Sequence, residues 1–315
     1  MSLCLIIDEM HPSLLPMLAG IGVEGDYQPT LKPAEVPAAL AARPYAGLMV
    51  RSKMQITAEL LAHGPHLRYV ARAGAGVDNI DVEALGPAGV VLLNAPEGNR
   101  DAVGEFAVGA LLALFRHTVT ADAEVRRGEW RREANRGEEI GTKTVGLLGY
   151  GHMGRAFARR LSGFGCTVLA HDHDPTVFPD GHAQLVSLEE LQARADVLSI
   201  HIPYTPANHH LVNATFLAGF PRPLWLLNTA RGEVLSLADL VAALQSGQVR
   251  GAALDVLENE KLATLTAAQQ ASFDYLHRAP NVVLSPHIGG WTHQSYVRIN
   301  EVLTAKIGKL LAAQG

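Results

Sequence analysis

Short apolar runs alternate with longer alanine- and proline-rich stretches from residue 3 to about residue 95. Apolar runs of this length are typical of strands that are buried on both faces of a parallel sheet. Strands that alternate with helices in this way indicate βαβ units. The predicted strands of this first part are residues 3–8, 46–50, 68–72 and 90–93.

A long apolar helix is predicted at residues 101–117, with Asn99 or Asp101 as its N-cap. A polar stretch follows, and at Val145 a second series of strands and helices begins. Thr292 is placed to cap a final helix, which we expect to pack back on the first part. The predicted strands of the second series are 145–148, 168–172, 197–201, 225–228, 251–255 and 282–285, and its predicted helices are 153–165, 188–194 and 237–246, the last closed by Gly247.

The chain is too long, at 315 residues, for one ordinary hydrophobic core. We therefore predict an α/β protein with two doubly wound parallel-sheet domains. The first comprises residues 1–97 and 291–315, and the second comprises residues 98–290. We expect substrate and cofactor to meet in the cleft between them.

Composition and charge exclude several classes of function. The net charge is -5 and no long basic run occurs, so we expect neither a nucleic-acid partner nor a membrane partner. Only two cysteines are present, Cys4 and Cys166, which indicates a reducing compartment rather than a disulfide framework. The N-terminus lacks the basic segment of a signal peptide, and the apolar stretch 102–115 is shorter than the ~20 residues that span a bilayer. We expect a cytoplasmic protein.

A glycine-rich turn lies between the first predicted strand of the second part and the helix after it. Gly149, Gly151 and Gly154 follow the strand text TVGLL in the spacing G-x-G-x-x-G. Glycines in this place permit a tight turn and let backbone N–H groups approach a pyrophosphate at the helix N-terminus. Asp172 ends the next predicted strand, where a carboxylate accepts hydrogen bonds from a ribose and repels a 2′-phosphate. The pattern predicts NAD; the alternative is a structural turn and a solvent-exposed acid.

Three further segments, 228–232, 255–260 and 285–290, follow later predicted strands, at the edge of a parallel sheet where ligands bind. Arg231 suits a substrate carboxylate, because a guanidinium can bind it bidentately. His287 is suited to accept the proton of the substrate hydroxyl, because imidazole exchanges protons near neutral pH. A carboxylate behind the imidazole would orient it. Each residue alone could be an ordinary surface or loop residue, but together they predict hydride transfer at C2 of a 2-hydroxy or 2-oxo acid.

Two other chemistries are not supported by the spacing of the remaining residues. His171 and His173, and likewise His209 and His210, have no further ligand at metal-site spacing, so no metal is predicted. No G-x-S-x-G turn occurs, so a serine hydrolase of the usual α/β type is not expected.

The sequence resembles the D-isomer-specific 2-hydroxyacid dehydrogenases along nearly its whole length, and among them most of all the D-3-phosphoglycerate dehydrogenases. Besides the segments above, the resemblance rests on VRS at 50–52, RAGAGVDN at 72–79 and NAPEGN at 94–99. It implies a Rossmann NAD-binding domain and a flavodoxin-like substrate domain. It also implies that Arg231 binds the substrate, that His287 is the acid/base, and that Glu260, rather than Glu258, is its partner. The residues that match the family's NAD contacts are His152, Met153, Asp172, Ile202, Thr229, Ala230, Asp255 and Gly289, beside the three glycines; those that match its phosphoglycerate site are Arg51, Arg72, Gly76 and Asn99.

Two departures from the family pattern concern the choice of substrate. Lys261 stands where the family usually has proline, and the stretch between Glu260 and His287 is longer than in typical phosphoglycerate enzymes. The resemblance implies phosphoglycerate dehydrogenase, with a glyoxylate, hydroxypyruvate or D-lactate reductase as the alternative. An NAD(H)-sensing binding protein without turnover is the alternative of another class.

A homodimer is also expected by analogy, with residues 126–139 and the apolar Trp130 near its interface.

Overall fold

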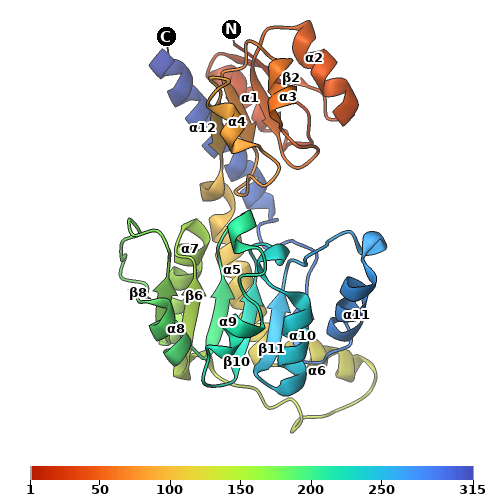
Figure 1. The fold of residues 1–315 in the computed structure, drawn as a ribbon, viewed down its shortest axis with the longest axis vertical. Coiled ribbons are helices and arrows are strands. Elements are labelled where there is room, and N and C mark those ends of the chain that lie inside the picture. Colours follow the sequence, from red (N-terminus) through yellow and green to blue (C-terminus); the bar gives the residue numbers. More distant parts are fainter. Residues whose placement is uncertain (1, 315) are drawn as a thin grey trace. The chain divides into compact units, whose positions relative to one another are not determined.

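The computed structural model describes residues 2–314. By its internal contacts the chain divides into two compact units, Met1–Asn99 with Trp291–Gly315, and Arg100–Gly290 (Figure 1). Each unit is built on its own parallel sheet with helices on both faces. The predicted fold class, an α/β protein with two doubly wound parallel sheets, is confirmed.

The first unit has a five-stranded parallel sheet in the order β2-β1-β3-β4-β5. This is the flavodoxin-like strand order. Successive side chains of β1 alternate between two cores, with Leu3 and Leu5 in one and Cys4 and Ile6 in the other. The strands are β1 (Ser2–Ile6), β2 (Val23–Tyr27), β3 (Tyr45–Val50), β4 (Tyr69–Arg72) and β5 (Val91–Asn94); α2 (Val36–Ala42), α3 (Ala58–Ala62) and α4 (Val82–Leu85) cover the first core, and α1 (Leu14–Gly20) and α12 (His293–Gln314) the second.

The second unit has a seven-stranded parallel sheet in the order β12-β11-β10-β9-β6-β7-β8. Chain order reverses at β6, which pairs with β7 on one side and β9 on the other, so ligands of this fold bind beyond the carboxyl ends of these strands. The strands are β6 (Thr144–Leu148), β7 (Thr167–His171), β8 (Gln184–Leu185), β9 (Val197–Ile200), β10 (Leu224–Asn228), β11 (Val249–Leu254) and β12 (Val282–Leu284).

Helices cover both faces of this second sheet (Figure 1). Apolar side chains of α5 (Pro96–Phe115) and α7 (His152–Leu161) fill the core on one face. The core on the other face is filled from α8 (Leu188–Arg194), α9 (Ala214–Ala218), α10 (Leu237–Ser246) and α11 (Ala267–Leu276). A further helix, α6 (Thr118–Arg126), follows α5 directly.

The ends of several helices test the predicted caps. Helices α8 and α10 have the predicted bounds, and Gly247 ends α10 with φ +79. Thr292 caps α12 as predicted, since its hydroxyl accepts a hydrogen bond from the N–H of Ser295 (3.0 Å). The prediction of Asn99 or Asp101 as the cap of α5 is wrong. That helix begins at Pro96, whose fixed φ suits a first helical position, so both residues lie inside it.

No single helix of residues 2–314 is both long and apolar enough to cross a membrane. Helices α5 and α6 would meet that test only as a pair, and they are bent by 61° at their junction. Within the same residues, no three His, Cys, Asp or Glu side chains are grouped so that they could hold a metal ion.

Candidate active site

The glycine turn joins β6 to α7, and each glycine has its own geometric reason. Gly149 has φ +97, a conformation that favours glycine. A Cβ on Gly154 would lie 2.3 Å from the carbonyl oxygen of Gly149, so α7 packs against the turn too closely for a side chain. A Cβ on Gly151 would meet nothing within 4 Å, which leaves the start of α7 open. His152 and Met153 form the first turn of α7. The turn therefore fits the pyrophosphate of a dinucleotide.

Asp172 directly follows β7, and its carboxylate is fixed against the glycine turn. Its Oδ2 accepts a hydrogen bond from the N–H of Tyr150 (2.7 Å), and its Oδ1 accepts one from the N–H of Asp174 (3.0 Å). Nδ1 of His173 lies 3.5 Å from Oδ1. The side chain is only 13% exposed. This is the place at which dinucleotide-binding folds present an acid to the adenosine ribose.

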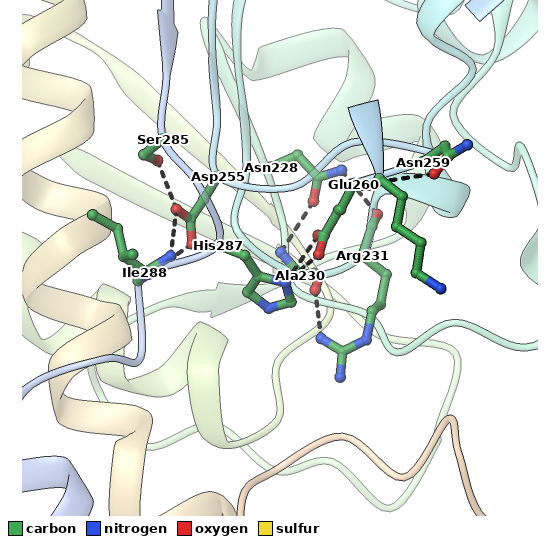
Figure 2. Close-up of polar contacts among 11 residues, drawn as sticks. Asn228, Ala230, Arg231, Asp255, Asn259, Glu260, Ser285, His287 and Ile288 are labelled. Atoms are coloured by element: carbon green, nitrogen blue, oxygen red, sulfur yellow. Dashed lines mark hydrogen bonds and ion pairs between the residues drawn. The ribbon is translucent and has the colours of Figure 1, made fainter. Parts of the chain in front are cut away.

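His287 and Glu260 are brought together by neighbouring strands (Figure 2). Glu260 lies beyond the end of β11, and His287 lies beyond the end of β12, its parallel neighbour. Nδ1 of the imidazole is 2.8 Å from Oε1 and 3.1 Å from Oε2 of Glu260. The two side chains are 45% and 47% exposed. Because Nδ1 faces the carboxylate, Nε2 is the ring nitrogen that points away from it and can exchange a proton with a ligand.

Arg231 extends from the turn after β10, and its guanidinium projects to the same side as the His287 imidazole (Figure 2). Its Nη1 donates to the carbonyl of Ala230 (2.6 Å). The turn is held by Asn228, which is 1% exposed. The Asn228 side chain donates to the carbonyl of Arg231 (2.9 Å) and accepts from the N–H of Ala230 (3.0 Å). This buried amide fixes the backbone from which Arg231 extends.

The carboxylate of Asp255, which is 3% exposed, holds the loop that carries His287 (Figure 2). Its Oδ1 accepts hydrogen bonds from the hydroxyl of Ser285 (2.6 Å) and the N–H of Ile288 (2.9 Å), and its Oδ2 accepts one from the N–H of Gly289 (2.7 Å). The backbone carbonyl of Asp255 accepts from the N–H of His287 (2.8 Å). Since a carboxylate has about four acceptor positions, about one remains for a bound ligand.

Ile202 and Thr229, two further residues predicted at the cofactor site, follow β9 and β10. A Cβ on Gly149 would lie 2.8 Å from Cγ2 of Ile202, so this side chain touches the glycine turn. Oγ1 of Thr229 is buried and has no hydrogen-bond partner within residues 2–314. Thr229 and Asp255 line the same apolar hollow, together with Phe106 of α5.

His201 also lies beside the glycine turn, although the sequence analysis did not single it out as a functional residue. Its Nε2 is 2.9 Å from the hydroxyl of Ser199, and its ring centre is 5.6 Å from that of Phe157 on α7. Its Nδ1 is buried and has no hydrogen-bond partner in the described part of the chain. Burial lowers the pKa of His201 to about 4, so the imidazole is neutral near neutral pH.

Arg51 directly follows β3 in the first unit, and its guanidinium is stacked on aromatic rings. Its central carbon lies 4.5 Å from the ring centre of Trp291 and 5.4 Å from that of Tyr296. Its backbone N–H donates to Oδ2 of Asp8 (2.6 Å). Among residues 2–314 no carboxylate forms an ion pair with the Arg51 side chain, so its charge is not neutralised locally.

The other residues predicted at the substrate site, Arg72, Gly76 and Asn99, belong to the same unit. Arg72 ends β4, which is the parallel neighbour of β3. A Cβ on Gly74 would stand 1.7 Å from Nη1 of Arg72, so the guanidinium lies against the backbone of Gly74, two residues before Gly76. Oδ1 of Asn99, inside α5, is buried without a hydrogen-bond partner in residues 2–314.

Five residues in the second unit make contacts that the sequence analysis did not predict: Asn228, His201, Ser285, Glu258 and His210. Asn228 and Ser285 stand at strand ends within motifs that were recognised, so their positions carried a usable signal. The contacts of His201 with Phe157 and of Glu258 with His210 join separate segments and have no such signal. Of the two glutamates after β11, it is Glu260 that contacts His287.

Residues 108–289, more than half of the chain, match the family model described as the NAD-binding domain of D-isomer-specific 2-hydroxyacid dehydrogenase. The chain belongs to the D-isomer-specific 2-hydroxyacid dehydrogenases. The predicted family is thus confirmed, and the unit Arg100–Gly290 contains the NAD-binding domain of this family.

Several members of the family are similar over most of this chain. A D-3-phosphoglycerate dehydrogenase of Mycobacterium bovis is 38% identical over 280 residues, which are 87% of this chain and 51% of the relative. The chain thus spans about half the length of that relative. A hydroxypyruvate reductase of Thermotoga maritima is 35% identical over 84% of both chains. The crystal structure of a glyoxylate reductase from Paecilomyes thermophila has a TM-score of 0.85 at 25% identity, covering 98% of this chain and 95% of that chain.

Proposed function

We propose that this dehydrogenase transfers hydride to or from C2 of a D-2-hydroxy acid or its 2-oxo acid, with NAD as the cofactor. The proposal rests on the contact between His287 and Glu260, with the Arg231 guanidinium on the same side. The reaction needs an acceptor for the hydroxyl proton, a cation for the substrate carboxylate and a group that orients the acceptor. His287, Arg231 and Glu260 supply them in that order.

In the direction of oxidation, Nε2 of neutral His287 takes the proton of the C2 hydroxyl. Glu260, at Nδ1, stabilises the imidazolium that forms and keeps the ring oriented. Arg231 binds the substrate carboxylate, and Asn228 keeps its backbone in place. Bound NAD supplies the hydride chemistry. In the direction of reduction, the same imidazolium returns its proton to the oxygen of the 2-oxo acid.

The choice of NAD over NADP follows from Asp172, since its carboxylate would repel a 2′-phosphate. The nearby Arg155 is occupied: its Nη1 bonds to Asp180 (3.0 Å) and its Nη2 to the carbonyl of Phe178 (2.7 Å). A reductase of Sinorhizobium meliloti, 28% identical, is NADPH-dependent, so the preference needs a test in this chain. We expect Asp172→Asn to lower the preference for NAD, measured as kcat/KM with NAD divided by kcat/KM with NADP, by about tenfold or more. This is the size expected for loss of a hydrogen bond to a charged group. An equal or better wild-type value with NADP would refute the assignment.

The substrate proposed first is 3-phosphoglycerate. A phosphorylated acid needs a cation beyond Arg231, and the unpaired charge of Arg51 supports that role. The Thermotoga relative, of which this chain covers 84%, favours hydroxypyruvate as the second candidate, and the structure from Paecilomyes thermophila favours glyoxylate. A panel of 3-phosphoglycerate, hydroxypyruvate, glyoxylate and D-lactate, followed by NADH absorbance, decides between them. Turnover of unphosphorylated acids alone would establish the second candidate.

The role of Arg51 has its own test. Arg51→Ala should raise KM for 3-phosphoglycerate about ten- to hundredfold and leave KM for glyoxylate nearly unchanged. Arg43→Ala is the matched control, because Arg43 lies in the same unit but is paired with Asp26 (2.8 Å). Equal losses of Arg51→Ala on both substrates would show that Arg51 supports the structure instead.

We also propose a homodimer. The stretch after α6 is fixed by Glu124, whose carboxylate bonds to the side chains of Arg131 (3.2 Å) and Asn135 (2.6 Å). Trp130, within that stretch, is 84% exposed, which suits an interface between subunits. Light scattering should give a dimer for the wild type and for Phe178→Ala, another exposed aromatic, but a weakened dimer for Trp130→Ala. A wild-type monomer at micromolar concentration would refute the proposal.

A further inference from the structure

A second glutamate–histidine pair lies on the same loop as Glu260. Oε1 of Glu258 accepts a hydrogen bond from the N–H of Leu237, the first residue of α10 (2.6 Å), and lies 3.2 Å from Nε2 of His210. The Glu258 side chain is 14% exposed, whereas Glu260 is 47% exposed. The loop therefore carries one anchored carboxylate and one open carboxylate.

The backbone beside Glu258 packs against the segment that follows Arg231. A Cβ on Gly232 would lie 2.0 Å from both the carbonyl carbon and the carbonyl oxygen of Leu257, and 2.5 Å from the nitrogen of Glu258. No side chain fits between these two stretches of backbone. The loop that leads to Glu260 and the turn that carries Arg231 thus meet at Gly232.

His210 is itself held in an unusual conformation. Its φ is +50, in the left-handed region that few residues other than glycine and asparagine adopt. Its N–H donates to the carbonyl of Glu233 (2.8 Å), and its ring stacks on His209 with 4.0 Å between the ring centres. A strained residue persists only where its surroundings fix it. Here the surroundings turn Nε2 toward Glu258.

The pair formed by Glu260 and His287 needs such an anchor. Both side chains are close to half exposed, and an ion pair in that environment contributes little by itself to holding two segments in place. Glu258 is better placed for this task, since its carboxylate is mostly removed from water and bonds to a backbone N–H and an imidazole.

We propose that Glu258 and His210 are a positioning pair, which holds the loop 257–260 so that Glu260 meets the His287 imidazole and Arg231 stays beside it. The inference rests on the proposed function, because it assigns no chemistry to Glu258 itself. Glu258 acts through the backbone of its loop, through Gly232 and through the start of α10.

The first test is kinetic. Glu258→Ala should lower kcat about ten- to hundredfold, the size expected when a catalytic group is displaced by about 1 Å. KM for NADH should change far less. The pH–rate profile should move to lower pH, in the direction expected of Glu260→Gln, because both changes take the Glu260 charge away from His287. Glu190→Ala, which removes an exposed carboxylate paired with Arg194 on α8, is the matched control and should behave as wild type.

A double-mutant cycle separates positioning from general destabilisation. If Glu258 acts through Glu260, the double variant Glu258→Ala/Glu260→Gln should be little slower than the worse single variant. Independent losses that multiply, together with an unmoved pH profile in Glu258→Ala, would overturn the proposal.

A third variant keeps the proposal testable if Glu258→Ala does not fold. Asparagine tolerates a positive φ, but its side chain is too short to reach Glu258, so His210→Asn removes the pair without straining the backbone. It should shift the pH profile as Glu258→Ala does. A wild-type profile in His210→Asn, with the effect of Glu260→Gln intact, would refute this inference alone. If Glu260→Gln and His287→Ala also left turnover unchanged, the proposed function itself would fail.

Discussion

The buried imidazole of His201 is expected to make the protein less stable as the pH falls below neutrality. Burial lowers the pKa of His201 to about 4, whereas an unfolded histidine titrates near 6.5. Between these two values the unfolded chain binds a proton that the native protein does not bind. The free energy of unfolding is therefore greatest above about pH 6.5, decreases as the pH falls toward 4, and loses nothing more from this group below that.

The size of the effect follows from the same difference in pKa. Once the pH is below the folded-state pKa, the loss in the free energy of unfolding amounts to about 3 kcal/mol. At pH 5.5 linkage gives roughly 1.4 kcal/mol, and since the residue keeps some exposure we expect about 1 kcal/mol.

Urea unfolding at several pH values between about 8 and 5.5 measures this loss. His201→Gln keeps a polar group near Ser199 but cannot be protonated, so it should lose about 1 kcal/mol less than the wild type over that range. His66→Gln, at an exposed histidine, should follow the wild type. Equal losses in the wild type and His201→Gln would show that His201 is not kept neutral by the fold.

Other residues yield predictions of the same kind. His287→Ala should lower kcat by about 10²–10⁴ with little change in NAD affinity, and Glu260→Gln should move the pH–rate profile to lower pH; an unmoved profile would exclude Glu260 as the partner. The hydrogen bond from Asn135 lowers the pKa of Glu124, so its stabilisation is present above the ordinary glutamate pKa and is lost as the pH falls below it. The melting temperature of Glu124→Gln should therefore lie below that of the wild type at about pH 6, and the difference should shrink as the pH falls below the ordinary glutamate pKa. Gly232→Ala should cost about 1–3 kcal/mol of stability in urea unfolding, through overlap with the facing loop, and also lower kcat; unchanged stability would contradict that packing.

The parts of the fold that could be predicted from the sequence are those with a strong local pattern. Strands buried on both faces, such as β6 and β10, appear as continuous apolar runs, and the glycine turn has fixed spacing. Strand β2 was missed because it lies at the edge of its sheet, where the sequence VEGDY includes a glycine and charges. The two-residue β8 is the other sheet's edge strand and has even less pattern to read.

The candidate site was predictable in its residue types but not in the contacts that arrange them. The spacing of Glu258 and Glu260 alone does not say which one meets His287, since both follow the same strand. That choice is made by Leu237 and His210, which lie in other segments of the unit and contact the Glu258 carboxylate. Contacts between segments that are tens of residues apart leave no mark on a local pattern.

The unusual backbone of His287 is best understood as a consequence of how its loop is held. Three consecutive N–H groups, those of His287, Ile288 and Gly289, all donate to Asp255. Here they reach the backbone carbonyl and both carboxylate oxygens of that residue, and successive N–H groups point to one side in this way when the backbone alternates between right- and left-handed conformations. The φ of +56 at His287 is the left-handed step of that arrangement. The strain of about 1–3 kcal/mol that such a residue stores is offset by hydrogen bonds to a buried carboxylate, each of which contributes about 1.5–3 kcal/mol. The imidazole is thereby fixed at its backbone by Asp255 and at its Nδ1 by Glu260, so Nε2 is the end of the ring that faces away from both and that we propose for the substrate.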